Sequence, residues 1–206
     1  MQMNAANPVI MRRFIICCNI TRLTQLLNSR DFNGNLNYLR SLICHYRREL
    51  ALLDADEYGA FSALRRELNA QGDGKCVDYA RLVDHNIKSD LPAIILDPRP
   101  GLKILFVNES FATETGLSRA RLLGRPVYDA FPGNPEASES ECISHTFDSI
   151  RRTTSLKEPQ ILTHQRYDVG SSDGVFMECY WRMEFHPLLG KNEQVEFIKM
   201  VAAKMT

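Results

Sequence analysis

The fold is decided by one stretch of the sequence, residues 104–125, which reads ILFVNESFATETGLSRARLLGR. Its apolar run ends at Asn108, whose side-chain oxygen can accept a hydrogen bond from the free backbone N–H groups that begin a helix. Gly116 and Gly124 supply the positive φ with which short helices commonly end. The stretch carries no reactive group. It therefore predicts a buried strand that leads directly into short, capped helices, an arrangement typical of a binding module.

The motifs that extend this stretch resemble a PAS domain, a small sheet-and-helix sensor fold. Residues 104–131 resemble its first half. Four further motifs resemble the PAS subgroup found in front of bacterial histidine kinases. They are FPGNP (131–135), HQRYDV (164–169), SSDG (171–174) and CYWRMEFHPLL (179–189). The resemblance covers residues 91–203. It implies an α+β fold with a PAS-like five-stranded antiparallel sheet, short helices on one face, and a role in a two-component signalling system.

Composition limits the classes of function. The chain has 206 residues, 44% of them hydrophobic, which is enough for one core with an appendage or for two small domains. Its 25 Lys and Arg residues balance 25 Asp and Glu residues, so no net field favours nucleic acid or anionic lipid. Its apolar runs are too short to cross a bilayer. We expect a cytoplasmic protein that binds neither nucleic acid nor membrane.

The cysteines point to no structural site. They are Cys17, Cys18, Cys44, Cys76, Cys142 and Cys179, and none forms a C-x-x-C pair. Two adjacent cysteines have poor geometry for zinc or for a structural disulfide. We expect reduced thiols that pack as small hydrophobic groups, with a thiol redox sensor as the alternative.

Residues 1–90 are predicted to form an N-terminal helical segment that precedes the sensor domain at residues 91–206. Isolated helices of moderate length are marginal in water, so their apolar faces must pack on the sheet, on each other or on a second subunit. We therefore expect a homodimer formed through the N-terminal helices.

Three helices are expected within this segment, after a mobile leader at residues 1–13. Apolar residues recur at three- and four-residue intervals over residues 36–53 and again over residues 58–68. The turn cluster at residues 71–74 ends the second helix, and a third, short helix is expected at residues 77–83.

From Pro92 the periodicity changes to that of strands. Strands are expected at residues 93–96, 102–107, 160–169, 175–186 and 195–202, and a longer helix at residues 136–154. Along residues 175–186 every second residue, from Val175 to Phe185, is apolar, and the residues between them are mostly polar, so one face of this strand belongs to the core. The last strand is apolar on both faces and should be covered on both, by the N-terminal helices or by a partner subunit.

The sequence contains no recognisable catalytic constellation. It has no G-x-S-x-G elbow, no H-E-x-x-H motif, no Walker loop and no G-x-G-x-x-G after a strand. No nucleophile with a base beside it can be named. We therefore expect a module that is not an enzyme and that holds no metal.

The resemblance to PAS domains implies a ligand pocket against the sheet. The residues expected to line it are Phe106, Phe111, Phe147, Ile150, Tyr167, Cys179, Trp181 and Met183. Arg166, Tyr167 and Asp168 are expected to form a local polar network or to end a β-ladder, in preference to contacting the ligand.

The sequence does not identify a cofactor, and the leading expectation is that none binds. Haem is the alternative, because the spacing of His145 to the following strand resembles that of the iron-ligating histidine in haem-binding PAS domains. Arg166 is one residue out of register with the arginine of that group, a shift that turns a strand side chain to the opposite face. The Gly-x-Asn-Cys-Arg-Phe context of flavin-based light sensors is absent.

These features favour a signal-sensing PAS module. It would bind a small-molecule ligand or a partner protein and relay the signal through flanking helices to a separate output protein. Two alternatives stay open, a protein-interaction or dimerisation module without a ligand, and a haem-based gas or redox sensor. We expect the output to be made through another chain, unless this sequence is part of a longer protein.

Overall fold

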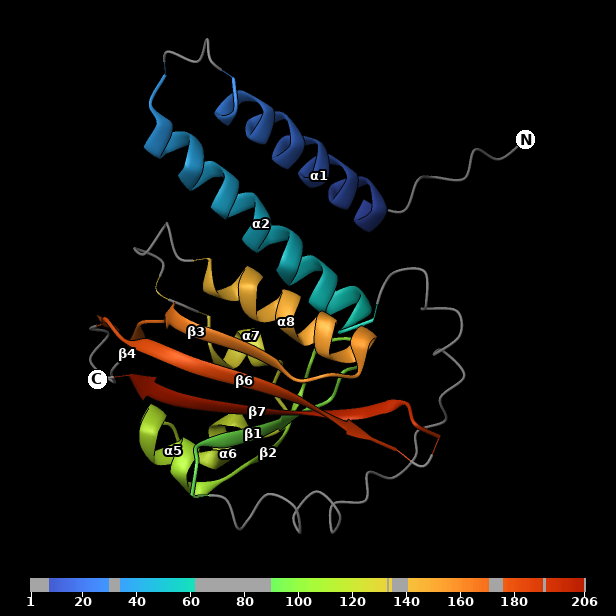
Figure 1. Cartoon of the computed structure of the whole chain (residues 1–206), viewed down its shortest axis with the longest axis vertical. Helices are drawn as coiled ribbons and strands as arrows, with labels where there is room; N and C mark the ends of the chain where they lie inside the picture. Colours follow the sequence, from blue (N-terminus) through green and yellow to red (C-terminus); the bar gives the residue numbers. More distant parts are fainter. Residues whose placement is uncertain are drawn as a thin grey trace.

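A five-stranded antiparallel sheet organises the chain (Figure 1). The structure, a computed structural model, describes residues 8–29, 34–61, 90–132, 134, 141–170, 176–190 and 192–205. The strands of the sheet are β1 (Ala93–Leu96), β2 (Ile104–Val107), β3 (Gln160–Arg166), β6 (Tyr180–Leu189) and β7 (Val195–Met205), in the order β2-β1-β7-β6-β3. A separate pair consists of β4 (Val169–Gly170) and β5 (Phe176–Met177).

Helices cover one face of this sheet. Those among the described residues are α1 (Pro8–Leu27), α2 (Leu36–Tyr58), α5 (Glu109–Thr115), α6 (Arg119–Leu122), α7 (Val127–Ala130) and α8 (Cys142–Leu156). In Figure 1, α8 lies against the sheet, α2 lies against α8, and α1 forms the outermost layer. The predicted fold, a PAS-like five-stranded antiparallel sheet with short helices on one face and a preceding helical segment, is confirmed.

Asn108 joins the strand β2 to the helix α5, as its sequence context predicts. Its side-chain oxygen accepts hydrogen bonds from Phe111 N at 2.9 Å and from Ala93 N at 3.0 Å. Its amide donates to the carbonyl of Leu91 at 2.7 Å. One buried amide thus caps a helix and ties two strands together, since it satisfies donors of both elements.

The core lies between the sheet and the helices, and a smaller apolar cluster lies on the other face. Residues of α2, α5, α6, α7 and α8 pack with the inner side chains of the sheet. The smaller cluster consists of Ile95, Phe106 and Phe197, with Leu105 and Leu188 against it. The expectation that β7 is apolar on both faces is therefore confirmed. The described N-terminal helices do not cover the outer face, because α2 packs on α8.

The N-terminal segment differs in part from the prediction. The helix expected at residues 36–53 is confirmed and continues to Tyr58, where Gly59 ends it. The expected leader at residues 1–13 is wrong from Pro8 onward, because α1 begins there. The α1 helix packs on α2 through the buried Ile16 and through Arg13, whose Nε donates to Asp54 Oδ1 at 2.7 Å. The helix expected at residues 58–68 does not begin where predicted, because Tyr58 ends α2 and residues 59–61 are not helical. The remainder of that helix and the one expected at residues 77–83 lie outside the described residues.

Two strand predictions need correction. The strand expected at residues 175–186 is interrupted, because β5 pairs with β4 and the ladder of β6 begins only at Tyr180. Met177 is consequently 54% exposed, although the pattern placed it in the core. The strand expected at residues 160–169 ends at Arg166, after an irregularity at which His164 has a φ of +54°. The buried face predicted for β6 is confirmed by its inward-facing residues, Trp181, Met183 and Phe185, and by Cys179 just before them.

Candidate ligand pocket

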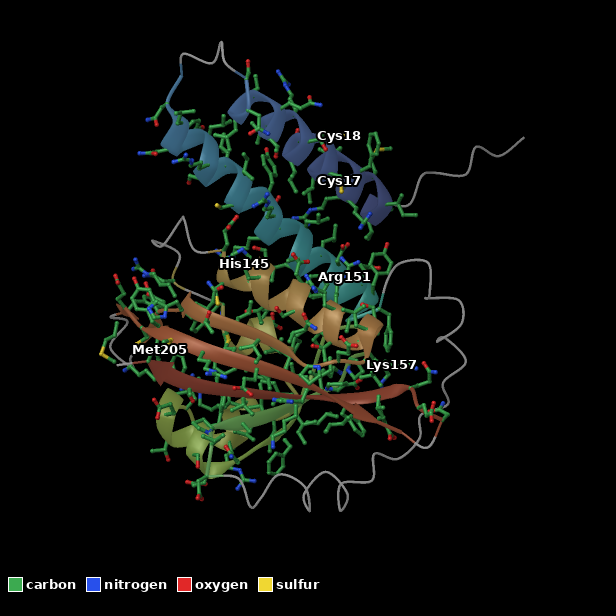
Figure 2. The ribbon with its side chains drawn as sticks, in the orientation of Figure 1. Cys17, Cys18, His145, Arg151, Lys157 and Met205 are labelled. Carbon is green, nitrogen blue, oxygen red and sulfur yellow. The ribbon has the colours of Figure 1, made fainter. Side chains whose placement is uncertain are left out.

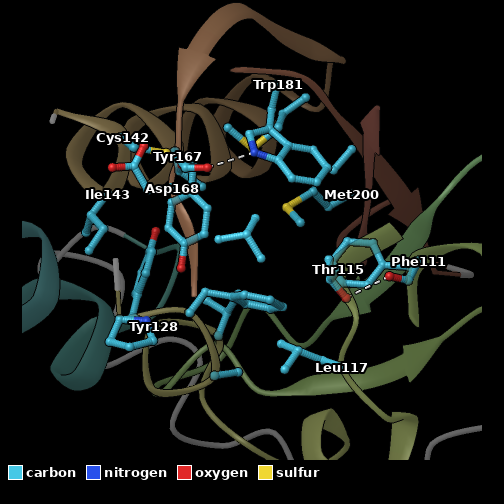
Figure 3. A pocket seen from close by; sticks show the side chains of 18 of the residues that line it. Phe111, Thr115, Leu117, Tyr128, Cys142, Ile143, Tyr167, Asp168, Trp181 and Met200 are labelled. Carbon is cyan, nitrogen blue, oxygen red and sulfur yellow. Dashed lines mark hydrogen bonds between the residues drawn. The ribbon is translucent and has the colours of Figure 1, made fainter. Parts of the chain in front are cut away.

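A cavity of about 250 Å³ lies between the inner face of the sheet and the helices α5, α7 and α8. Figure 3 shows the labelled rings of Tyr128, Tyr167 and Trp181 around it. Its described lining consists of Phe111, Thr115, Leu117, Val127, Tyr128, Ala130, Phe131, Pro132, Cys142, Ile143, Thr146, Tyr167, Asp168, Val169, Phe176, Trp181, Met183, Met200 and Ala202. Pro132 and Phe176 are exposed, which places the mouth of the cavity between the end of α7 and β5.

Most polar groups in this lining are already paired within the protein. Thr115 Oγ1 donates to the carbonyl of Phe111 at 2.8 Å, and Trp181 Nε1 donates to the carbonyl of Tyr167 at 2.9 Å (Figure 3). Cys142 Sγ and Thr146 Oγ1 lie 3.7 Å apart. Burial raises the pKa of the Cys142 thiol to about 11, so the thiol is neutral at physiological pH. A ligand would therefore meet walls that are mostly apolar, with Asp168 as the charged group among the described lining residues.

Tyr128 is the exception. Its hydroxyl oxygen is buried and has no hydrogen-bond partner among the described residues. Burial, followed by the proximity of Cys142, raises the pKa of Tyr128 well above its usual value. The phenol is therefore protonated and able to donate a hydrogen bond at any physiological pH.

The Arg-Tyr-Asp motif forms the polar network that was expected. The Arg166 guanidinium donates to Asp168 through Nε at 3.0 Å and through Nη2 at 3.1 Å. Asn134 Nδ2 adds a third hydrogen bond at 2.8 Å. The hydrogen bonds from Arg166 outweigh the effect of burial and lower the pKa of Asp168. For Tyr167, a local structural role and a place in the cavity wall occur together. Its backbone N–H donates to the Cys179 carbonyl, and its side chain lines the cavity.

The structure brings together half of the side chains expected at the pocket. Phe111, Tyr167, Trp181 and Met183 line the cavity. Phe147, Ile150 and Cys179 are buried in the same core cluster but do not reach the lining.

The prediction that Phe106 lines the pocket is wrong, because this residue lies on the opposite face of the sheet with Ile95 and Phe197. The pairing of β1 with β2 is irregular at Leu105, which leaves Ile104 and Val107 facing the helices and turns Phe106 outward.

Sequence reasoning missed the helical wall of the pocket, notably Tyr128, Phe131 and Ile143. The residues 127–130 form a helix of a single turn, which is too short to show a periodic pattern. The one sequence signal for this wall of the pocket was that Cys142 and Thr146 share the buried face of the following helix.

His145 does not fit the role of a haem ligand. Its side chain is 45% exposed and lies on the face of α8 that is directed toward α2, away from the cavity lining (Figure 2). Its Nδ1 lies 3.0 Å from Gln165 Oε1, and its Nε2 lies 3.2 Å from Glu141 Oε2. Both ring nitrogens therefore have protein partners. Among the described residues, no group of three or more His, Cys, Asp or Glu side chains is arranged to hold a metal ion.

The lining also does not match the groups of a flavin. A flavin ring presents carbonyl and N–H groups along one edge, and its phosphate carries negative charge. The described residues of the lining include no Asn, Gln, Lys or Arg that could meet such groups through side chains.

No helix in the described part of the chain is long and apolar enough to span a bilayer.

Solved structures similar to this chain include PAS and LOV domains. The LOV protein of Rhodobacter sphaeroides is 13% identical with a TM-score of 0.47, over 62% of this chain and 66% of that one. A sensory box sensor histidine kinase from Vibrio cholerae is 16% identical with a TM-score of 0.40, over 62% and 89% of the two chains. A LOV domain studied with a flavin analogue is 20% identical with a TM-score of 0.43, over 63% and 87%.

These likenesses concern the fold, which is PAS-like. The chain spans just under two thirds of the length of the Rhodobacter protein. No protein-family model matches the sequence, and no curated protein matches it.

Proposed function

We propose that this chain is a signal-sensing module that binds a small molecule in the cavity and is not itself an enzyme. The observation that carries the proposal is the apolar cavity of about 250 Å³, which is lined by core residues of the sheet and the helices and opens between α7 and β5. Concave sites lined mainly by apolar and aromatic side chains are where proteins usually bind small molecules. A ligand that binds one arrangement of the surrounding helices better than another would shift their equilibrium.

The helix α8 is the proposed route from the cavity to the N-terminal helices. Cys142 and Ile143 face the cavity at the start of α8, and Glu141 precedes them. Glu141 Oε1 accepts a hydrogen bond from Arg47 of α2 at 2.8 Å and lies 3.5 Å from Cys44 Sγ. Burial is the largest single effect and raises the pKa of Glu141, but the hydrogen bond and the charge of Arg47, together with Cys44 and His145, lower this pKa by more, so the carboxylate stays charged. A shift of this end of α8 would therefore change the position of α2.

Filling the cavity is expected to abolish ligand binding with little loss of stability. Ala202 lies on β7 and faces the cavity, so Ala202→Leu places the added carbons in empty space. In a filled core, the same overpacking costs about 1–3 kcal/mol. We expect the free energy of unfolding to change by less than about 1 kcal/mol. Native mass spectrometry of protein taken gently from its host should show a bound mass in the wild type that the variant lacks.

The matched control is Ala203→Leu, because the neighbouring residue on a strand faces the other side of the sheet. This variant should retain the bound mass. Equal occupancy in both variants would show that the ligand, if any, binds elsewhere. The visible absorbance of the purified protein is part of the same experiment, since one structural neighbour was studied with a flavin analogue.

A second copy of the chain is the partner that we propose for α1. Its exposed patch consists of Ile10, Met11, Phe14, Ile15 and Cys18, and the patch contains no charged residue. The opposite side of α1 is already packed on α2. A helix that is apolar on two opposite sides is normally buried on both. This is also the observation that favours the alternative function, a dimerisation module without a ligand.

A charge placed in this patch is expected to weaken the dimer. Phe14 is 64% exposed in the single chain, so Phe14→Glu should leave the fold intact and raise the dimer dissociation constant at least about tenfold. Gln25→Glu adds the same charge to the polar end of α1 and should have little effect. Light scattering over a wide concentration range measures both. A wild-type chain that stays monomeric throughout would contradict the proposal.

The output protein is proposed to be a separate chain that recognises the position of α1 and α2, as in a two-component system located in the cytoplasm. Hydrogen–deuterium exchange of α2 tests this relay once a ligand is known. Protection that changes only around the cavity would argue for a binding module without a relay.

A further inference from the structure

Most hydrogen-bonding side chains of the described cavity lining are satisfied within the protein. Thr115 Oγ1 donates to the carbonyl of Phe111 at 2.8 Å. Trp181 Nε1 donates to the carbonyl of Tyr167 at 2.9 Å. The hydroxyl oxygen of Tyr128 is fully buried within the wall, so a molecule in the cavity does not contact it. An N–H or carbonyl group of a ligand would exchange its hydrogen bonds to water for contacts with carbon, which weakens binding.

The other polar groups of the described lining leave no charge available to a ligand. Cys142 Sγ and Thr146 Oγ1 lie 3.7 Å apart and can bond to each other. The Asp168 carboxylate accepts hydrogen bonds from Arg166 at 3.0 Å and from Asn134 at 2.8 Å. A cationic ligand would have to compete with Arg166 for this carboxylate. An anionic ligand would meet the charge of Asp168 and no cation in the described lining. Either would lose its hydration without compensation.

The apolar part of the lining is rich in aromatic rings and thioethers. The ring of Phe131 packs edge to face on those of Phe111 and Tyr167, with centroids 5.9 Å and 6.3 Å apart. Met183 and Met200 line the cavity from the strands β6 and β7. Aromatic rings pack favourably on further rings at such distances, and so do thioether sulfurs. These walls therefore favour an aromatic occupant.

The volume of the cavity indicates the size of the ligand. A dry, apolar cavity of roughly 150 Å³ accommodates benzene, so about 250 Å³ has room for two fused rings. We propose that the cavity binds an uncharged aromatic molecule of about two fused rings and selects against N–H, carbonyl and charged groups on it. This inference rests on the proposed function, because it names the class of ligand for the same cavity.

Five bicyclic probes of similar size separate the effects of a donor, an acceptor and a charge. Indene has no polar group, indole adds an N–H donor, and 1-indanone adds a carbonyl acceptor. At neutral pH, 1-aminoindane is a cation and indane-1-carboxylate is an anion. Isothermal titration calorimetry of the full chain gives the affinity of each probe.

We expect indene to bind most tightly. Indole and 1-indanone should each bind at least about fivefold more weakly, because one polar group loses its hydrogen bonds to water without replacement. The two charged probes should bind more weakly still. Ala202→Leu fills the cavity and should abolish the binding of indene. Ala203→Leu, on the other face of β7, should retain it.

The possible contrary results distinguish the ligand class from the proposed function. If indole, 1-indanone or a charged probe binds as tightly as indene and Ala202→Leu abolishes that binding, the apolar class is overturned while the cavity remains a binding site. If no probe binds to the wild type, the proposed function is overturned and the ligand class with it. Binding of indene that is unchanged in Ala202→Leu would place the site outside the cavity and overturn both.

Discussion

Asn108→Ala is expected to lower the free energy of unfolding by roughly 2–5 kcal/mol. The substitution leaves the backbone N–H groups of Ala93 and Phe111 without the acceptor that they share, and it removes the donor to the Leu91 carbonyl. Because the site is buried, water cannot replace these bonds at no cost, and each unsatisfied group contributes about 1–3 kcal/mol. Urea denaturation followed by circular dichroism measures the loss.

Asn35→Ala is the matched control for this prediction. Asn35 caps α2 in a similar way, since its side-chain oxygen accepts from Asn37 N at 3.0 Å and from Tyr38 N at 3.1 Å. It is exposed, so its loss should cost only about 1 kcal/mol, the usual value for a helix cap. Similar losses in the two variants would mean that Asn108 acts as a helix cap alone, without a role in joining the strands.

Local signals explain what could be predicted of the fold. The side chain of Asn108 contacts residues that its own sequence context identifies, and the alternation in β6 follows from burial on one face. The α1 helix was missed because it is apolar on both the packed and the exposed side, which removes the amphipathic period. The outward position of Phe106 depends on the irregular pairing of β1 with β2. Such a bulge is set by the partner strand and leaves no mark in a single sequence.

The residues of the candidate site likewise divide into those that local sequence signals could place and those that they could not. Trp181 and Met183 were predicted because a strand fixes which side chains face the core, and both line the cavity. Tyr128 lies on a helix of four residues, where no period exists to place a side chain. His145 has the spacing of a ligand but lies on the face of α8 that is directed toward α2, outside the cavity lining. Spacing along a helix does not determine which way the helix faces.

Gly59→Ala is expected to destabilise the chain by roughly 3–5 kcal/mol, through both conformation and packing. Gly59 ends α2 with a φ of +62° and a ψ of −142°, a region that residues with a Cβ rarely adopt. An added Cβ would lie 2.4 Å from the Pro98 carbonyl oxygen and 2.5 Å from the Arg99 carbonyl carbon. These are backbone atoms, so relief requires α2 to separate from the turn between β1 and β2. Urea denaturation and near-ultraviolet circular dichroism detect this separation.

Gly116→Ala separates the two contributions. Gly116 has a φ of +66°, but an added Cβ would meet nothing within 4 Å, so only the conformational cost of about 1–2 kcal/mol applies. The difference between the two variants measures how firmly α2 is held at the turn, where Gly101 N also donates to the Ala55 carbonyl at 2.9 Å. If both variants lose the same stability, this end of α2 is not held by close packing. If Gly59→Ala costs more, α2 is fixed at its C-terminal end, and the contacts of Cys44 and Arg47 with Glu141 and of Arg48 with Pro132 are the places at which a ligand could displace it.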